Sequence, residues 1–574
     1  MKDSVSIFIF FTMKRLFIHA LCLFILMTLG CAKMPYVKYY TAGNKLAQFS
    51  KKDIERGSKT KERLAYDITF YNWTIRPNCE KKSVEGNMDI HFKGGLNHNV
   101  ILVDLQRRLK IDSLLSTSEI EKYQRKGDAL YIYFDENIQV GENYVLSIKY
   151  HGKPANIANQ GPIVWSEDRA GNPFYSTLTQ GIGPHYLFPC KDMLYDEPDS
   201  CNIRVGIMED LRVVANGNLA KTYKEDQWNY YLWKVKNPIN VYNISFNVGK
   251  YAHLNYTYES PLHGEQTISA WALEEDLDKA QPFYQQAILV MIEYEKMFGE
   301  FPWEEDGCAF VESAINGGAM EHQSAISMGK ILRNNWTNDT LNFKMNSTLV
   351  HELAHEWWGN SVTAEDYCDA WLHEGLATYC ESLIAERLNG KSAYRLAINF
   401  ERRGIENKRP VQKTCGVRYN SWANSKDHDI YNKGALFLHT IRQQLNNDEL
   451  FFSALKRIYD ENKKSHITTD TFKQVFEDET GQNLTPYFDV YLTQNMPPVL
   501  QYHFNPETSE FYYRWKNKLP EGFKMKVLMG EGDFLELYPT YEYQKVTLRN
   551  KADQTVAQEH FGYIIIEKDK KFKS

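Results

Sequence analysis

A five-residue segment, His-Glu-Leu-Ala-His at positions 351–355, constrains this chain more than any other feature. The sequence around it predicts a helix, because apolar residues recur at helical spacing, residues 346–348 offer N-caps and a Gly-Asn pair follows. On a helix, His351 and His355 lie on one face, one turn apart, so both imidazoles can bind the same metal ion. The segment therefore predicts a metal site, with the carboxylate of Glu352 directed to the same side.

A third metal ligand is offered by Glu374, in the segment Trp-Leu-His-Glu-Gly-Leu-Ala at positions 371–377. A second predicted helix runs from this segment to Gly390, so a helical hairpin can fold Glu374 back over the two histidines. Two histidines and one glutamate leave a fourth position open for water, which is typical of catalytic zinc sites. We therefore expect one zinc ion per chain, bound by His351, His355 and Glu374.

This ligand set predicts hydrolysis of a peptide bond. Zinc lowers the pKa of a bound water and polarises a carbonyl group. Glu352 would accept the proton of that water as general base and deliver it to the leaving amine. The oxyanion needs a donor besides zinc, and Tyr431 is our candidate. Composition alone cannot select Tyr431 from 37 tyrosines, and core packing is the alternative role for it.

These segments resemble the gluzincin zinc aminopeptidases, the family that includes aminopeptidase N and leukotriene hydrolase. The likeness rests on the segment at 351–355, on Glu374 within Trp-Leu-x-Glu-Gly-x-Ala, and on Tyr-x-Lys-Gly beginning at Tyr431. It extends from about Leu64 to Leu500. The resemblance implies a hydrolase that removes residues from peptides with a free N-terminus, with Glu352 and Tyr431 as catalytic residues.

A further segment, residues 317–322, resembles the family's exopeptidase motif Gly-x-Met-Glu-Asn, which lies on an edge strand. The resemblance implies that Glu321 binds the substrate's α-amine and that Gln180, upstream of a Phe-Pro-Cys-x-Asp segment, assists it. The strand would pair with the substrate backbone, and Met320 would shape the pocket. The implied substrate-binding residues are Gln180, Gly318, Ala319, Met320 and Glu321.

The sequence departs from the family pattern at three places. His322 and His373 each replace an asparagine, at positions that are neither ligands nor acid-base groups, so we expect them to tune activity rather than abolish it. Larger members carry a long helical C-terminal domain, whereas a short β module follows Leu500 here. We therefore expect a short form with a more open active site.

The order of patterns predicts a multidomain α+β protein. Short alternating runs dominate from Leu64 to about His253, helical periods from about Asp276 to Leu492, and alternation returns after two prolines. We expect an N-terminal antiparallel β domain, a thermolysin-like catalytic domain and a small C-terminal β sandwich. The expected segments are a lipoprotein-type signal peptide (1–30), a tether (31–62), a β saddle domain (63–255), the catalytic domain (256–498) and the β sandwich (499–574).

The N-terminus predicts export and lipidation. Two basic residues precede an apolar run, Leu16–Met27, which is too short to span a bilayer and has the length of a signal-peptide core. The run leads to Leu-Gly-Cys31, as in bacterial lipoproteins, although Thr28 stands where a larger aliphatic residue is usual. We expect Cys31 to be lipidated and the protein to be anchored in a bacterial cell envelope membrane. A secreted or soluble periplasmic protein is the alternative.

The charge and the cysteine content limit the classes of partner, metal site and disulfide pattern that this chain can have. The formal net charge of −6 is spread without a basic block, so we expect no nucleic-acid partner. Seven cysteines follow Cys31 and none forms a Cys-x-x-Cys pair, which predicts neither a disulfide framework nor a cysteine-ligated zinc. Cys190 and Cys201 are close enough in sequence to form a disulfide, and two buried thiols are the alternative.

Three other functions compete with the aminopeptidase hypothesis. A pseudoenzyme that binds peptide N-termini is disfavoured, because Glu352, Tyr431 and all three ligands are present. The zinc site could also open a lipid epoxide, but nothing in the sequence indicates a lipid channel. An endopeptidase is disfavoured by Glu321, because a residue that binds the α-amine fixes the cleaved bond at a set distance from the N-terminus of the substrate.

Overall fold

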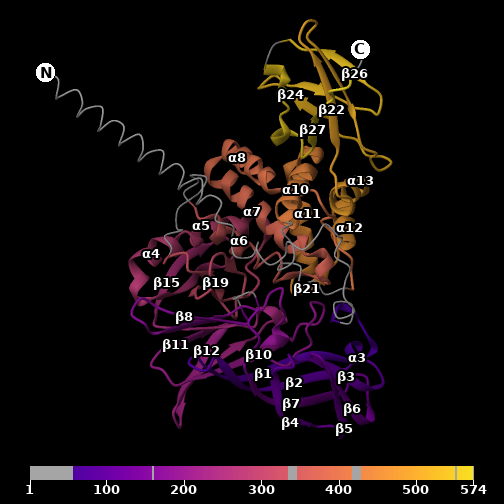
Figure 1. Cartoon of the computed structure of the whole chain (residues 1–574). Helices are drawn as coiled ribbons and strands as arrows, with labels where there is room; N and C mark the ends of the chain where they lie inside the picture. The colour runs from indigo at the N-terminus through magenta and orange to yellow at the C-terminus, as the bar shows by residue number, and fades with distance from the viewer. Residues whose placement is uncertain (1–55, 158–160, 334–344, 417–427, 550–551, 573–574) are drawn as a thin grey trace, which may run out of the picture. The chain divides into compact units, whose positions relative to one another are not determined.

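The computed structural model describes residues 56–157, 161–333, 345–416, 428–549 and 552–572 (Figure 1). The expected signal peptide, Cys31 and most of the expected tether lie outside these residues. In the described ranges, no helix is both long enough and apolar enough to cross a lipid bilayer. The tether's last residues, 56–62, are described, and Arg56 among them forms an ion pair with Asp192 at 3.4 Å.

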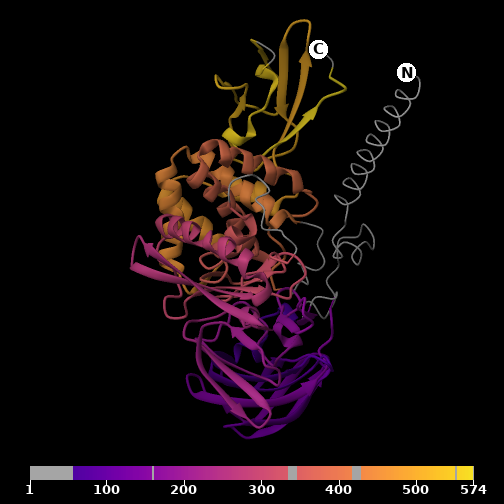
Figure 2. The same cartoon turned by 90° about the vertical axis from the view of Figure 1, so that its left-hand side faces the viewer.

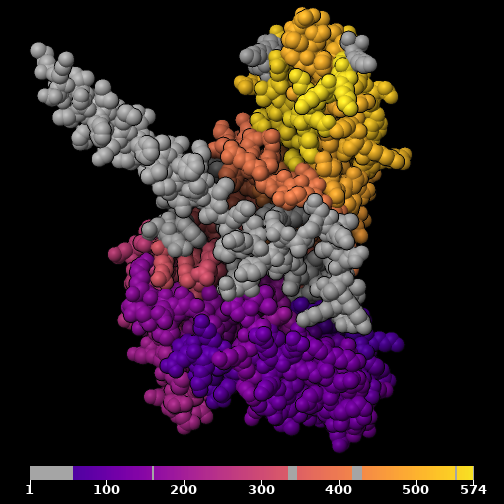
Figure 3. Space-filling view, viewed as in Figure 1, coloured from indigo at the N-terminus to yellow at the C-terminus, as the bar shows by residue number. Residues whose placement is uncertain are grey.

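The N-terminal part, coloured indigo to magenta in Figures 1 and 3, is rich in strands, which Figure 1 draws as arrows. Its largest sheet has seven strands, and alternate residues of its longest strand, β1, are buried, as expected for a pleated strand with one covered face. The strands, in spatial order, are β12 (Asn218–Glu225), β13 (Trp228–Val235), β10 (Ser200–Ile207), β1 (Tyr66–Asn78), β2 (Ser83–Gly94), β7 (Asn143–Gly152) and β4 (Leu109–Ser116).

This sheet corrects the expectation of a purely antiparallel domain. Strands β1 and β10 pair in parallel, with Phe70 opposite Ser200, whereas the other pairs of the sheet are antiparallel. A parallel pair needs a long crossover between its strands, and alternation within one strand carries no information on the direction of its neighbour. Two smaller sheets complete this part: β11 (Arg212–Ala215), β14 (Phe246–Gly249), β9 (Pro173–Thr177) and β8 (Ile163–Glu167), then β3 (His98–Asp104), β6 (Ala129–Ile138) and β5 (Ile120–Lys126).

A five-stranded sheet leads into the helical part. Its order is β15 (Tyr251–Ser260), β16 (Gly264–Leu273), β17 (Cys308–Ser313), β19 (Ile326–Gly329) and β18 (Ala319–Met320). The short strand β18 is therefore at the edge of the sheet, with a single partner, β19. The helices that follow this sheet and matter below are α6 (Ser347–Ala354), α7 (Trp371–Asn389), α8 (Lys391–Glu401) and α10 (Asn432–Leu445).

The helix boundaries have local causes. Asn346 begins α6 by accepting a hydrogen bond from the backbone N–H of Leu349 (3.1 Å), and Gly390 ends α7. Helix α6 is shorter than expected: it ends at Ala354, and tighter turns follow.

The C-terminal segment is again made of strands, drawn yellow in Figures 1 and 2. Four of them form one sheet in the order β26 (Gln544–Thr547), β23 (Glu510–Trp515), β22 (Val499–Asn505) and β27 (Ile565–Lys568). Two more, β24 (Val527–Met529) and β25 (Leu535–Leu537), pair with each other. Most of the buried apolar side chains of this segment belong to the same hydrophobic cluster as those of the helical part.

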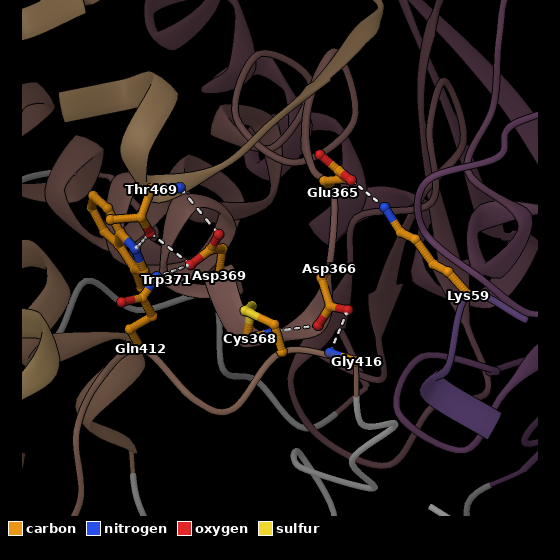
Figure 4. The surroundings of a disulfide bond; sticks show 10 residues. Lys59, Glu365, Asp366, Cys368, Asp369, Trp371, Gln412, Gly416 and Thr469 are labelled. Carbon is orange, nitrogen blue, oxygen red and sulfur yellow. Dashed lines mark hydrogen bonds and ion pairs between the residues drawn. A yellow bond between two sulfur atoms is a disulfide. The ribbon is translucent and has the colours of Figure 1, made fainter. Parts of the chain in front are cut away.

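One disulfide bond joins Cys368 to Cys415 (Figure 4). The sequence did not predict this pair, because 47 positions separate the two residues. Cys190 and Cys201, the pair considered from the sequence, are both buried, lie on different segments of the β-rich part and do not form a disulfide bond.

Candidate active site

The three expected metal ligands converge from two helices. His351 lies on α6, His355 caps its end, and Glu374 lies in the first turn of α7. The Nε2 atoms of the histidines are 3.1 Å apart, and Glu374 Oε2 lies 3.4 and 3.5 Å from them. A tetrahedral ion with ligands at about 2.1 Å separates those ligands by about 3.4 Å. The donor set and its spacing therefore fit zinc.

The other ring nitrogen of each histidine is engaged. His355 Nδ1 donates to the carbonyl oxygen of Trp358 at 2.9 Å, and His351 Nδ1 contacts Glu381 Oε1 at 3.0 Å. Partners at Nδ1 leave Nε2 as the nitrogen that binds a metal. Burial alone would raise the pKa of Glu374, but hydrogen bonds and charge from both histidines hold it well below its usual range. This carboxyl group is therefore ionised, as a metal ligand must be.

Glu352 lies in the same cavity with one carboxylate oxygen free of protein partners. Its side chain is buried, and Oε2 has no hydrogen-bond partner among the described residues. Burial and the nearby carboxylates of Glu321 and Glu374 raise the pKa of Glu352 to about 8, although His351 and His355 act in the opposite direction. A carboxyl group that titrates near neutral pH can both accept and return a proton.

Glu321 closes one end of the cavity, directly after the edge strand β18. Its Oε1 accepts hydrogen bonds from Gln180 Nε2 (2.6 Å) and from the Tyr242 hydroxyl (2.9 Å). The amide of Asn360 donates to the Glu321 carbonyl oxygen at 2.9 Å. Burial raises the pKa of Glu321, so a cation beside it would stabilise its ionised form. The arrangement suits the binding of an ammonium group.

The cavity has a volume of about 280 Å³. Ten of its lining residues are His351, Glu352, His355, Glu374, Gln180, Gly318, Ala319, Glu321, Tyr431 and Glu381. Ser347 and Thr348, in the first turn of α6, complete the lining. Residues of the β-rich part, the edge strand and both helices thus meet around one space.

Met320 is not among these lining residues, contrary to the expectation that it shapes the pocket. Its side chain is buried in the hydrophobic cluster of the β-rich part. Successive side chains of a strand point to opposite faces, so Ala319 and Glu321 face the cavity while Met320 faces away. What Met320 can still offer a substrate is its backbone.

Tyr431 lies immediately before α10 and faces His351 across the cavity. Its ring and the imidazole are stacked, with centroids 6.1 Å apart. The hydroxyl of a tyrosine at this place can donate a hydrogen bond to an oxyanion formed beside the metal ligands.

The two histidines that replace family asparagines are buried and neutral. Burial lowers the pKa of both His322 and His373 to about 3. His322 Nδ1 contacts the Ser327 hydroxyl at 2.9 Å, and His373 Nε2 accepts a hydrogen bond from the backbone N–H of Ala364 at 2.8 Å. Neither lines the cavity, and both hold neighbouring backbone and side chains in place.

Three residues of this site were missed at the level of sequence: Tyr242, Asn360 and Glu381. Glu381 follows the ligand Glu374 by two helical turns, so helical periodicity could have placed both carboxylates on one face. Tyr242 is 79 positions from Glu321 in the chain and belongs to no motif. Contacts of that kind depend on the packing of separate segments, which local sequence does not reveal.

The fold and the site are those of a metallopeptidase. Residues 284–491 match the model of the peptidase family M1 domain, and residues 68–242 match that of the peptidase M1 N-terminal domain. The chain belongs to peptidase family M1, which confirms the resemblance to the gluzincin aminopeptidases.

Several aminopeptidases are similar to this chain. Aminopeptidase B of Rattus norvegicus is 24% identical over 379 residues, which cover 62% of this chain and 53% of the relative. Leucine aminopeptidase 2 of Saccharomyces cerevisiae is 25% identical over 345 residues, covering 57% and 47%. Aminopeptidase N of Canis lupus familiaris is 24% identical over 272 residues, covering 45% and 27%. The chain thus matches about half of the length of the first two relatives and less of the third.

Proposed function

We propose that this protein is a zinc-dependent aminopeptidase that hydrolyses the N-terminal peptide bond of peptides. One observation carries the proposal: the amine-binding carboxylate and the metal ligands share a single cavity. Ligand atoms of Glu321, Glu352 and His355 all lie within 4.8 Å of one another. A free α-amine held at Glu321 would therefore place the first peptide bond of a substrate at the metal site.

The residues divide the reaction among them. Zinc held by His351, His355 and Glu374 would activate water and polarise the scissile carbonyl group. Glu352 accepts the proton of the attacking water at its free oxygen and passes it to the leaving amine. The Tyr431 hydroxyl donates to the oxyanion of the tetrahedral intermediate.

A matched pair of peptides tests this proposal. The purified protein should cleave a free-amine peptide and leave its N-acetylated form nearly intact, because acetylation removes the charge that Glu321 recognises and adds bulk there. A chelator should abolish the activity, and added zinc should restore it. Glu321→Ala should lower kcat/KM for the free peptide by a factor of about 30 or more, the range for losing a buried charge-assisted contact. Equal cleavage of both peptides by the wild type would contradict the aminopeptidase assignment.

We further propose that the protein is lipid-anchored through Cys31 in a bacterial cell envelope. The apolar run before Cys31 motivates this, and the Cys368–Cys415 disulfide supports an oxidising compartment. Cys31→Ser should move the protein from the membrane fraction to the soluble fraction, because the several acyl chains of a lipoprotein anchor firmly. A wild-type protein found wholly in the soluble fraction would remove the anchor and leave secretion as the alternative.

We also propose a thermolysin-like arrangement for residues 256–498 and a β sandwich for residues 499–574. The first is supported by the edge strand β18 lying beside the metal-binding helices α6 and α7. The second is supported by the two β-sheets of the C-terminal segment. An experimental structure of the full chain would test both.

A further inference from the structure

Helices α7 and α10 touch through two glycines beside the active site. A Cβ atom added to Gly434 would lie 2.9 Å from the Cα atom of Gly375. The reverse substitution would place a Cβ atom of residue 375 at 3.0 Å from Gly434 Cα and 3.1 Å from the carbonyl oxygen of Ile430. The obstructing atoms all belong to the backbone, so no change of rotamer can relieve the contact.

Backbone conformation does not explain these glycines. Neither Gly375 nor Gly434 has a positive φ, so an L-residue could adopt either conformation. A glycine inside a helix is less favourable than alanine by about 1 kcal/mol. Both helices therefore carry a residue of poor helix propensity at a place where their backbones meet.

The contact lies between two groups of the proposed reaction. Gly375 follows the metal ligand Glu374 directly, and Gly434 lies one helical turn after Tyr431. Packing continues along the same crossing, where the rings of Trp371 and Phe437 meet edge to face with centroids 5.5 Å apart. The distance between the two helix axes at this crossing therefore sets the distance between the Glu374 carboxylate and the Tyr431 side chain.

The start of α10 is also held from outside this crossing. The buried Lys433 Nζ donates to the carbonyl oxygens of Asn495 (2.7 Å) and Gln494 (3.1 Å). The Asn432 amide donates to the carbonyl oxygen of Glu401 at 2.8 Å. The first turn of α10 is thus fixed on both flanks, and it cannot slide to compensate for a wider crossing.

We propose that the Gly375–Gly434 contact is a spacer that positions Tyr431 relative to the metal ligands. The proposal rests on the proposed function, because it assigns the spacing a role in the same reaction. Gly375, Gly434 and Lys433 are positioning residues: none of them lines the cavity, and they act through Glu374 and Tyr431.

Gly434→Ala gives the first test. Helix propensity predicts a higher melting temperature for this variant, whereas the backbone contact predicts a lower one. We expect a lower Tm, zinc content equal to wild type, and kcat for a free-amine peptide reduced 10-fold or more with little change in KM. Gly249→Ala, in β14 of the β-rich part, is the matched control, because its Cβ atom would meet only side chains, the nearest at 3.1 Å. We expect this control to retain wild-type kcat and zinc. A Gly434→Ala variant with raised Tm and wild-type kcat would overturn the proposal.

A second test separates positioning from general damage. In a Tyr431→Phe background, Gly434→Ala should lower kcat little further, because the group that it displaces has already lost its hydroxyl. An equal additional loss in both backgrounds would show a merely structural role and overturn the proposal. A different result would contradict the proposed function: equal cleavage of free and acetylated peptides by the wild-type protein.

Lys433→Met is a milder variant that keeps the proposal testable if Gly434→Ala does not fold. Lys433→Met adds no atom at the crossing, and it removes the ammonium group that holds the carbonyl oxygens of Asn495 and Gln494. We expect normal zinc content and a several-fold loss of kcat that disappears in the Tyr431→Phe background. A wild-type kcat for Lys433→Met, in the case that Gly434→Ala does not fold, would also overturn the proposal.

Discussion

Each metal-facing histidine is oriented by a partner at its second ring nitrogen, and the two partners differ. His355 uses a backbone carbonyl oxygen, which no substitution removes, whereas His351 uses the carboxylate of Glu381. A carboxylate in this place fixes the ring and makes the imidazole a stronger ligand. Only the His351 side of the site can therefore be weakened without changing a ligand.

Glu381→Gln should weaken zinc binding about 10- to 100-fold, the range for loss of such an outer partner. The amide can still accept the hydrogen bond from Nδ1, but it carries no charge. Competition with a chromogenic chelator would measure the zinc affinity directly, and Glu386→Gln, on the same helix outside the cavity, provides the control. An unchanged affinity would show that Glu381 does not support the ligand.

Glu352→Gln should retain zinc and lose nearly all turnover. Glutamine has the same shape but cannot accept the proton of the attacking water. Zinc content by elemental analysis and kcat for a free-amine peptide should therefore separate, with full occupancy and a kcat lowered at least 10²-fold. Retention of wild-type kcat would exclude Glu352 as the base.

The sequence predicted those residues of this site that belong to short, recognisable motifs. His351 and His355 are one helical turn apart, and Glu374 lies in a recognisable segment. It did not predict Tyr242, which reaches Glu321 from another part of the chain. It also did not predict that the Met320 side chain points away from the cavity, into the hydrophobic cluster of the β-rich part. Those depend on which face of an edge strand packs against the β-rich part, and that is decided by tertiary contacts.

At the scale of elements, the order of strands and helices could be predicted and their partners could not. Alternation indicated the strands of the β-rich part but not the parallel pairing of β1 with β10. The Cys368–Cys415 pair was missed for the same reason, because the disulfide joins segments that only the folded chain brings together. Figure 4 shows that Asp366 also holds both segments, through the backbone N–H groups of Cys368 (2.9 Å) and Gly416 (3.0 Å).

Removing this disulfide should lower stability without lowering activity. A cross-link that closes 47 residues restricts the unfolded chain by about 4 kcal/mol in the chain-entropy account. The hydrogen bonds of Asp366 keep the native arrangement, so kcat well below the melting temperature should stay unchanged in Cys368→Ser/Cys415→Ser. Denaturant unfolding gives the stability, and Cys79→Ser, a change at a free thiol, is the control. A reductant should lower the Tm of the wild type but not that of the double variant.

The five-stranded sheet contains a buried acid that makes stability depend on pH. Glu312, on β17, accepts a hydrogen bond from the backbone N–H of Leu273, and burial, together with the neighbouring Asp276, raises its pKa from 4.5 to about 8. Between these values the folded state keeps a proton that the unfolded state releases. The free energy of unfolding should therefore fall as pH rises from about 4.5 to about 8, by at most about 1.4 kcal/mol per pH unit from this group.

Glu312→Gln should remove this contribution, because an amide keeps the shape of the protonated acid and does not titrate. Denaturant unfolding of both proteins at several pH values gives the two slopes, and their difference isolates Glu312 from other buried acids. Parallel slopes would show that Glu312 is already ionised in the folded protein.

At the scale of the whole molecule, the C-terminal segment and the catalytic helices share one core. Thr440, on α10, accepts a hydrogen bond from the backbone N–H of Tyr563 at 3.1 Å, and Gln444 donates to the carbonyl oxygen of Phe561 at 2.7 Å. Phe561 and Ile564 are buried in the cluster that also contains the inner face of α10. Helix α10, which directly follows Tyr431, is therefore covered by the last part of the described chain.

A chain that ends at residue 498 should consequently lose more than its C-terminal strands. Without residues 499–574 the apolar face of α10 would be exposed, and exposure of a buried Phe or Ile side chain costs about 1.5–3 kcal/mol each. We expect such a protein to be poorly soluble, to melt at a much lower temperature and to lose kcat before it loses zinc, because Tyr431 depends on α10 whereas the ligands lie on α6 and α7. Thr440→Val tests the same contact more gently, since it removes the hydroxyl at constant shape and should lower the free energy of unfolding by about 1–3 kcal/mol. A truncated protein with wild-type Tm and kcat would show that the C-terminal segment is an independent unit, and that α10 is stable without its cover.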